Sequence, residues 1–329
     1  MSELQINESS TSTWSKLGPR ATYGLAMLDL VERSPNIIVA TADLGNSSGL
    51  ERLRKLHPQR LIDVGIAEQN LIGVASGIAK EGFTVYASSF APFITMRASE
   101  QLRMNLGYME LDVKAVGIGS GLSMNFLGNS HFGLEDLSVV RAIPNIQIVS
   151  PADCTEVVKV INATAISGRP TYIRLTGAPG IRNINQSDYS FEIGKNIEYF
   201  EGFDLTFLAT GSMVGPAIEA AEILCKKGIK TGVVNCHTLR PFDSTHLGDL
   251  VQRTAAIITI EEHFTSGGLG TQVLEALNEM GSNFTVYRMG IPHKYDQSGS
   301  YEFLLNYYGL TSAMILEKTL KIMQTNLKI

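Results

Sequence analysis

Short apolar segments typical of buried strands alternate with helix-like segments along almost the whole chain. This order predicts mainly parallel β-sheets with helices on both faces, which is the doubly wound α/β class. Glycine and polar residues interrupt the alternation once, between residues 176 and 202. We therefore expect two domains, residues 16–188 and a smaller one at 189–329, with the boundary near Asp188. The polar residues 1–15 are expected to form a flexible arm.

Composition and charge narrow the class of protein. A chain of 329 residues with 44% hydrophobic residues can build two cores. Its net charge of −5 and its lack of basic runs argue against a nucleic-acid surface. No apolar run reaches the ~18 residues of a membrane span, and the polar N-terminus does not read as a secretory signal. The scattered cysteines, Cys154, Cys225 and Cys236, have no disulfide or zinc spacing, so we expect a cytoplasmic protein.

The stretch from Arg60 to Gly82 places an acidic residue in an apolar setting. Residues 60–65 read as a buried strand, and residues 67–80 read as a helix whose apolar or small side chains cover nearly every face. We expect this helix to be buried on all sides, with Glu68 in its first turn. A buried carboxylate needs a hydrogen-bond partner or stays protonated. Glu68 could stabilise the helix N-terminus or have a chemical role, and the local pattern leaves both open.

Five segments resemble the transketolase superfamily of thiamine-diphosphate enzymes, and they occur in the family's order. They are Ala40–Ser48, Asp63–Asn70, Tyr86–Arg103, Gly128–Asp153 and Ile257–Gly270. The resemblance implies a pyrimidine-binding domain followed by a transketolase C-terminal domain. It extends equally to 1-deoxyxylulose-5-phosphate synthase.

The family's diphosphate-binding domain carries a Gly-Asp-Gly motif, and this sequence has none. The resemblance therefore implies one half of a split enzyme. The expected partner is an N-terminal transketolase subunit with the diphosphate-binding domain, which would hold the cofactor's phosphates and a Mg²⁺ or Ca²⁺ ion. We expect no metal ligands in this chain, an active site between the two subunits, and an α2β2 heterotetramer.

The resemblance also implies residues that contact thiamine diphosphate. Glu68 is similar to the carboxylate that hydrogen-bonds pyrimidine N1′ and drives proton transfer, a role that favours a dry site. Phe90 and Phe93 match aromatic residues that contact the pyrimidine ring, although packing in the core would also explain them. Met96 falls where transketolases often have tyrosine, and Asp43 matches an acidic position facing the cofactor or, alternatively, caps a turn.

A second group would bind sugar or sugar-phosphate substrates. His131 is similar to a histidine that faces the donor's carbonyl oxygen and can move protons near neutral pH. Arg20 and Ser47 match residues that bind a distal phosphate, with surface and capping roles as the alternative. Arg97 matches an arginine near the substrate of deoxyxylulose-phosphate synthases, and a solvated helix face would explain it equally well.

Two positions depart from the family pattern. Leu127 replaces an aspartate that hydrogen-bonds a donor hydroxyl, and Gly177 stands near a position that carries a phosphate-binding arginine. The reaction type is therefore better defined than the usual pentose-phosphate substrates.

Three functions remain open. The leading hypothesis is transfer of a two-carbon ketol unit. A synthase that decarboxylates pyruvate fits Leu127, because pyruvate has no hydroxyl to bind. A non-catalytic scaffold would need none of Glu68, Phe90, Phe93 and His131. The glycine-rich turn at 267–270 could suggest a nucleotide site, but a tight turn packing a helix on a sheet explains it better.

Overall fold

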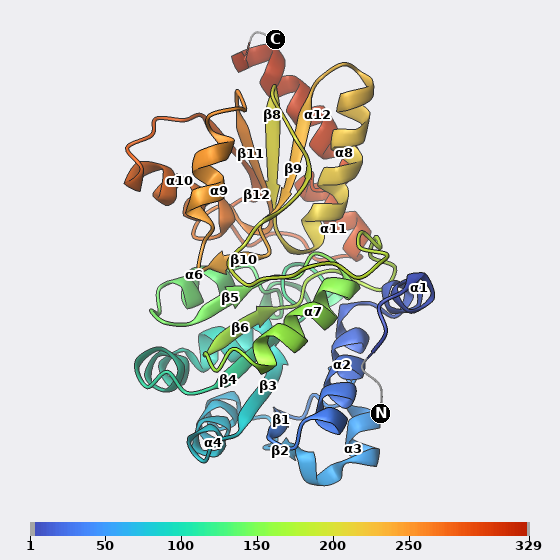
Figure 1. The fold of residues 1–329 in the computed structure, drawn as a ribbon, viewed down its shortest axis with the longest axis vertical. Coiled ribbons are helices and arrows are strands. Elements are labelled where there is room, and N and C mark those ends of the chain that lie inside the picture. The colour runs from blue at the N-terminus through green and yellow to red at the C-terminus, as the bar shows by residue number, and fades with distance from the viewer. Residues whose placement is uncertain (1–3, 328–329) are drawn as a thin grey trace.

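The computed structural model describes residues 4–327 and has two mainly parallel sheets, one above the other in Figure 1. The first sheet has seven strands in the order β10-β5-β6-β4-β3-β1-β2, and only β10 is antiparallel to its neighbour. The second has five in the order β12-β11-β8-β9-β7, and only β7 is antiparallel. These sheets confirm the predicted α/β class. The strands are β1 Ile37–Thr41, β2 Leu61–Asp63, β3 Thr84–Phe90, β4 Val113–Ile118, β5 Gln147–Val149, β6 Thr171–Arg174, β7 Ile197–Phe200, β8 Leu205–Ala209, β9 Thr231–Asn235, β10 Thr238–Arg240, β11 Ile257–Phe264 and β12 Val286–Ile291.

Helices cover both faces of the first sheet. Ile37 and Val39 of β1 point into a core shared with α2 and α7, whereas Ile38 and Ala40 point into a core shared with α4. Figure 1 shows α2 and α4 on opposite sides of this sheet. The α-helices are α1 Glu8–Leu17, α2 Pro19–Arg33, α3 Glu51–Leu56, α4 Glu68–Lys80, α5 Ser99–Gln101, α6 Asp136–Arg141, α7 Cys154–Ala165, α8 Val214–Lys226, α9 Ser244–Leu250, α10 Leu269–Glu279, α11 Tyr301–Tyr308 and α12 Ser312–Ile322. Shorter 3₁₀ and π segments are η1 Pro58–Arg60, η2 Phe93–Arg97, η3 Leu102–Tyr108, η4 Asn125–Ser130, η5 Gly211–Met213 and η6 Met323–Leu327.

The N-terminal segment differs from the expected flexible arm. Residues 8–15 belong to α1, where Asn7 forms a capping box with Ser10 and Trp14 is buried at 3% exposure. Trp14 packs this mostly polar helix against α2 and α7, and Leu4 and Ile6 before the helix contact the same core. Residues 1–3 of the predicted arm lie outside the described residues.

Helix α4 also differs from expectation, because it is not buried on all sides. Gln69, Asn70, Gly73 and Gly77 form an exposed face, and a Cβ atom added at either glycine would meet nothing within 4 Å. The opposite face packs Leu71, Ile72 and Ala75 into the core. Beyond Gln69 and Asn70 this face consists of glycines, which give no polar signal in the sequence.

The two domains share a strand, which the sequence did not indicate. Strand β10 follows β9 of the second domain but pairs with β5 at the edge of the first sheet. The predicted boundary near Asp188 falls in the irregular segment between β6 and β7, and it remains a prediction.

The glycine-rich turn at 267–270 is filled by protein atoms. The Glu261 carboxylate accepts hydrogen bonds from the backbone N–H groups of Leu269 (2.7 Å) and Gly270 (2.9 Å) at the start of α10. A Cβ atom at Gly268 would lie 1.9 Å from that carboxylate. This geometry favours the tight-turn interpretation, because the N-terminal donors of the helix are already satisfied.

Three buried carboxyl groups link folding to pH. Burial raises the pKa of Glu261 to about 7. Burial also raises the pKa of Glu156 to about 6, and burial together with the neighbouring Glu156 raises that of Asp153 to about 6. Each group binds its proton more tightly in the folded chain than in the unfolded one, so folding is favoured below its ordinary pKa and loses this contribution as pH rises through the folded value.

We expect the thermal midpoint to fall as pH is raised from 5 to 8, because the three carboxyl groups lose their protons in that window. Differential scanning calorimetry measures the fall. Glu261→Gln should make the fall smaller, whereas Glu279→Gln, at an exposed position of helix α10, should leave it unchanged. An equal fall in wild type and Glu261→Gln would contradict the assignment.

Candidate functional site

Glu68 is the first residue of α4, and its side chain is buried although α4 has an open face. It is 2% exposed. One carboxylate oxygen accepts a hydrogen bond from Ser89 Oγ of β3 at 3.3 Å, and the other pairs with Arg97 Nη1 at 2.7 Å. Ala67 at the N-cap offers no side-chain acceptor to the helix, so the acidic group also lies where the helix dipole favours negative charge. The carboxylate is therefore held by two donors and by the helix N-terminus.

A hollow of about 360 Å³ opens beside this carboxylate. It is lined by Ile66, Ala67, Glu68, Gln69, Asn70 and Arg97. The Ile66 side chain is 78% exposed at its rim. We call this space the Glu68 hollow. A buried acid next to an open, partly apolar space is a typical arrangement of a ligand site.

Three rings form an aromatic cluster next to Arg97. The ring centroids of Phe90 and Phe93 lie 6.0 Å apart, and His131 lies 5.8 Å from Phe90 and 5.2 Å from Phe93. All three contacts are edge-to-face, and the Arg97 guanidinium lies 4.2 Å from the centroid of Phe93. The contacts Glu68–Arg97–Phe93–His131 therefore form one continuous group.

Arg97 lines the Glu68 hollow, where its charge is paired with Glu68 and its guanidinium lies over the ring of Phe93. Its predicted contact with the substrate remains a prediction. Its side chain is still 47% exposed. Gln69 Nε2 donates to the Arg97 carbonyl at 3.1 Å and ties η2 to α4.

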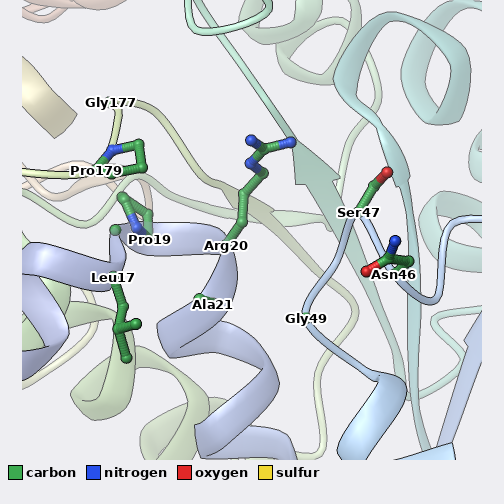
Figure 2. A pocket seen from close by; sticks show the side chains of 10 residues that line it. Leu17, Pro19, Arg20, Ala21, Asn46, Ser47, Gly49, Gly177 and Pro179 are labelled. Carbon is green, nitrogen blue, oxygen red and sulfur yellow. The ribbon is translucent and has the colours of Figure 1, made fainter.

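Arg20 and Ser47 meet in a second hollow, which we call the arginine pocket. It has a volume of about 320 Å³, and its lining also includes Asn46, Gly49, Gly177 and Pro179. Figure 2 shows the Arg20 side chain extending from the first turn of α2 between the loop at Gly177 and the turn at Ser47. Both hollows lie at the carboxyl edge of the first sheet, where open α/β sheets bind ligands.

The remaining predicted residues, Asp43, Met96 and Leu127, do not line either hollow. Asp43 is exposed after β1 with a left-handed φ of +56°, and its backbone N–H donates to Asp63 Oδ1 at 2.8 Å. Asp63, not Asp43, is therefore the acid that caps this turn. Met96 and Leu127 are 43% and 52% exposed. Their predicted roles remain predictions.

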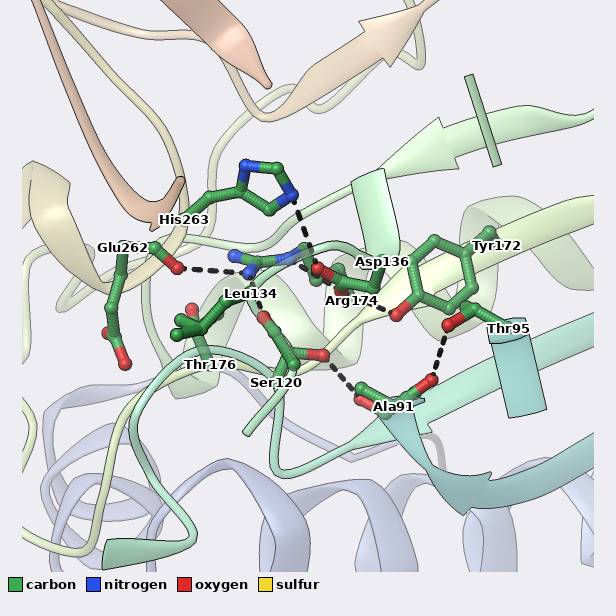
Figure 3. Close-up of polar contacts among 12 residues, drawn as sticks. Ala91, Thr95, Ser120, Leu134, Asp136, Tyr172, Arg174, Thr176, Glu262 and His263 are labelled. Atoms are coloured by element: carbon green, nitrogen blue, oxygen red, sulfur yellow. Dashed lines mark hydrogen bonds and ion pairs between the residues drawn. The ribbon is translucent and has the colours of Figure 1, made fainter. Parts of the chain in front are cut away.

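The loop that carries His131 is fixed by a buried polar network between the two sheets (Figure 3). Asp136 accepts hydrogen bonds from Arg174 Nε (2.8 Å) and the Tyr172 hydroxyl (2.7 Å). Arg174 Nη2 also donates to the carbonyls of Gly133 (2.9 Å) and Glu262 (3.0 Å). Arg174 thus holds the end of the His131 loop and strand β11 of the second domain together.

Charges in this network are balanced inside the protein. Burial alone would raise the pKa of Asp136, but the Arg174 guanidinium holds it below its ordinary value. Burial lowers the pKa of His263 to about 4, so this histidine is neutral at pH 7, with Nδ1 donating to the Phe264 carbonyl at 2.7 Å. The network therefore has a structural role. Within residues 4–327, no group of three or more His, Cys, Asp or Glu side chains could hold a metal ion.

Sequence reasoning missed several residues of the site. Ser89 and the Glu68–Arg97 pair depend on contacts between residues 21 and 29 positions apart, which no local pattern shows. Arg174 and Asp136 looked like ordinary strand and helix residues. Asn46 lies inside one of the matching segments, but an asparagine in a turn carries no signal of a ligand site.

Known proteins resemble the chain over nearly its full length. Family models of the transketolase pyrimidine-binding domain and the transketolase C-terminal domain match residues 15–178 and 196–315. A putative transketolase C-terminal section of Methanocaldococcus jannaschii is 35% identical over 93% of this chain and 96% of that protein. A 6-deoxy-6-sulfo-D-fructose transketolase subunit of Clostridium sp. (strain MSTE9) is 34% identical over 90% and 92%. The 1-deoxy-D-xylulose-5-phosphate synthase of Caldanaerobacter subterraneus is 33% identical over 91% of the chain, but the chain spans only 48% of that enzyme.

Solved structures give the same result. A split-gene transketolase, described as an inactive beta4 tetramer, superimposes with a TM-score of 0.84 at 36% identity, covering 92% of this chain and 97% of that one. The transketolase of Campylobacter jejuni shares the fold with a TM-score of 0.74 at 21% identity, and this chain covers 46% of it. The order of domains, the two sheets and the matches over more than nine-tenths of the chain agree. The chain belongs to the transketolase family and comprises its pyrimidine-binding and C-terminal domains.

Proposed function

We propose that this chain is one subunit of a thiamine-diphosphate-dependent transketolase that moves a two-carbon ketol unit from a ketose-type donor to an aldehyde acceptor. The observation that supports this most directly is the buried Glu68 carboxylate beside an open hollow and an aromatic cluster. A scaffold subunit would gain nothing from burying an acid next to an open space, because burial of a charge is costly.

The residues present fit the pyrimidine end of the cofactor. When bound, thiamine diphosphate supplies a nucleophilic carbanion at C2 of its thiazolium ring. Glu68 would hold a proton shared with pyrimidine N1′, in a site screened from water. Phe90 and Phe93 would offer apolar ring surface, and Asp43 and Met96 would lie at the edge of the site. His131, beside Phe93, would exchange protons with the substrate's oxygen atoms.

The partner subunit would supply what this sequence lacks. The sequence has no Gly-Asp-Gly motif and, across the described residues, no metal cluster. We propose that a chain with the diphosphate-binding domain holds the phosphates and a Mg²⁺ or Ca²⁺ ion in an α2β2 assembly. Ile66, Gln69 and Asn70 line the Glu68 hollow, and the open face of α4 continues from there to Gly73 and Gly77. A subunit docked there would cover both the hollow and this face.

Substrates would span from His131 to the arginine pocket. Arg20 and Ser47 would bind the distal end of a sugar or sugar phosphate, with Leu127 exposed on the His131 loop. Relatives named for a sulfofructose and for apulose 4-phosphate suggest that the family accepts different anionic sugars.

No described helix is long and apolar enough to cross a membrane. All three cysteines are free thiols, which suits the reducing cytoplasm we propose for it.

A pyruvate-decarboxylating synthase is the second candidate. The apolar Leu127 favours it, because this side chain cannot hydrogen-bond a donor hydroxyl. Mass analysis of products formed by the two-subunit complex from hydroxypyruvate or from pyruvate would separate the two reactions. Release of CO₂ from pyruvate with an acyloin product would replace ketol transfer as the assigned activity.

Glu68→Gln should reduce turnover of the two-subunit complex by about 10²–10⁴-fold, the range for loss of a proton-transferring group. Single-turnover and steady-state assays with hydroxypyruvate measure the loss, and circular dichroism checks the fold. Glu100→Gln is the matched control, because Glu100 is exposed and pairs with Arg103 on the same side of the domain. Near-wild-type rates for Glu68→Gln would contradict the role of Glu68. Full activity of this chain without a partner would contradict the split site.

Arg97→Met should lower the concentration of thiamine diphosphate that half-saturates the complex. Arg97 now holds the two groups that the pyrimidine needs, the Glu68 carboxylate and the face of Phe93, and cofactor binding has to displace it. Equilibrium titration of cofactor, followed by quenching of protein fluorescence, gives the change without relying on activity. Arg103→Met controls for loss of a nearby charge. Weaker cofactor binding by Arg97→Met would show that Arg97 supports the bound state instead.

A further inference from the structure

We infer that the arginine pocket selects a substrate whose distal end carries one negative charge, such as a sulfonate, over a phosphate dianion. This inference rests on the proposed function, because it names the class of substrate that the same site would accept. It follows from the charges that line the pocket and from the geometry that fixes them.

Arg20 is the one charged residue among the lining residues of the pocket, and no carboxylate is among them. Its side chain is half-buried at the start of α2, and its guanidinium has no hydrogen bond or ion pair with any residue in 4–327. Arginines elsewhere in the chain, such as Arg174 and Arg54, are paired with carboxylates. A guanidinium with free donors inside a hollow is suited to an oxyanion.

The other donors around the pocket are neutral. Ser47 contributes a hydroxyl and Asn46 an exposed amide. The first turn of α2 has no side-chain cap and no acidic residue, so no side chain caps the backbone N–H groups of Arg20 and Ala21. These groups can bind the oxygens of a tetrahedral anion, but they add no second full positive charge.

The glycine positions in the walls of the pocket cannot easily gain a cationic side chain. Gly177 has a φ of +88°, where a side chain would be strained, and a Cβ atom there would lie 2.8 Å from Ile181 Cδ1. The opposite walls are in close backbone contact, since a Cβ atom at Gly18 would meet Pro179 at 2.9 Å and one at Gly49 would meet the Arg20 carbonyl at 2.9 Å. The lining is therefore preorganised around one arginine.

One fixed charge balances one negative charge. A phosphate ester carries nearly two negative charges above its second pKa of about 6, so one of them would stay unpaired in a partly desolvated pocket. A sulfonate keeps a single charge at every pH used here and presents three oxygens of the same geometry. We expect this difference in charge to favour the sulfonate by about tenfold in kcat/KM, which corresponds to about 1.4 kcal/mol.

The test uses the assembled two-subunit complex and three donors with one carbon skeleton: 6-deoxy-6-sulfofructose, fructose 6-phosphate and fructose. At pH 7.5, kcat/KM should be highest for the sulfonate and lowest for fructose. At pH 5.5, where the phosphate ester is mostly singly charged, the ratio of sulfonate to phosphate should move towards one. Both donors are measured with the same enzyme at the same pH, so changes in the enzyme itself cancel in the ratio. Because the sulfonate does not titrate, the remaining change in the ratio reports the charge of the phosphate.

Two substitutions sharpen the result. Asn46→Lys adds a second cation at an exposed position of the lining and should reverse the preference at pH 7.5 in favour of the phosphate. Asn46→Gln keeps the charge and should keep the preference for the sulfonate. Arg20→Met should remove the advantage of both charged donors over fructose.

Hydroxypyruvate, which has no distal group, separates a failure of the charge inference from a failure of the proposed ketol-transfer function. If the complex transfers a ketol unit from hydroxypyruvate but prefers fructose 6-phosphate to the sulfonate at both pH values, the charge inference is wrong and the proposed function stands. If the complex uses neither hydroxypyruvate nor any of the three ketoses, the proposed function is wrong and the inference falls with it.

Discussion

The rest of the site depends on the pairing of one buried carboxylate with one half-exposed guanidinium. Glu68 at 2% exposure would be costly to keep ionised without a partner, and Arg97 provides that partner at 2.7 Å. Arg97 in turn rests on Phe93, whose ring touches His131. The charge, the apolar ring surface and the imidazole are therefore placed by one chain of contacts. Removing any one of them changes the environment of the others.

The second domain contributes to this site without lining the Glu68 hollow. The Glu262 carbonyl of its strand β11 accepts a hydrogen bond from the Arg174 guanidinium. The Glu262 side chain accepts a hydrogen bond from the Leu122 N–H at 2.6 Å, at the start of the His131 loop. Asn129 Nδ2 also donates to the Asp296 carbonyl at 3.1 Å. A loop rich in glycine and polar residues would otherwise be mobile. The C-terminal domain thus converts it into a fixed support for His131.

The sequence predicted both sheets from the α/β alternation, and it predicted a buried acid, Glu68, in the first turn of its helix. It did not show which residues contact Glu68. The docking of α1 escaped prediction because its apolar contacts, Trp14 with Leu4 and Ile6 before the helix, are scattered in a mostly polar segment. Strand β10 escaped because three residues carry no periodicity and pair with a different domain. The Glu68–Arg97 pair depends on side-chain conformations of residues brought together only by the fold.

The open face of α4 and the position of the Arg97 guanidinium both fit a site that is completed by a second subunit, as we propose. If a second subunit covers the Glu68 hollow as we propose, the free chain leaves the apolar Ile66 side chain at its rim in contact with solvent. Glycines at positions 73 and 77 limit the apolar area on the open face, because they carry no side chain. Arg97 neutralises the acid and covers the ring that would otherwise meet solvent. Because its side chain remains 47% exposed, it can leave Glu68 without disturbing the core behind it. In the proposed assembly, binding of the cofactor would therefore replace one ion pair and reorganise little else.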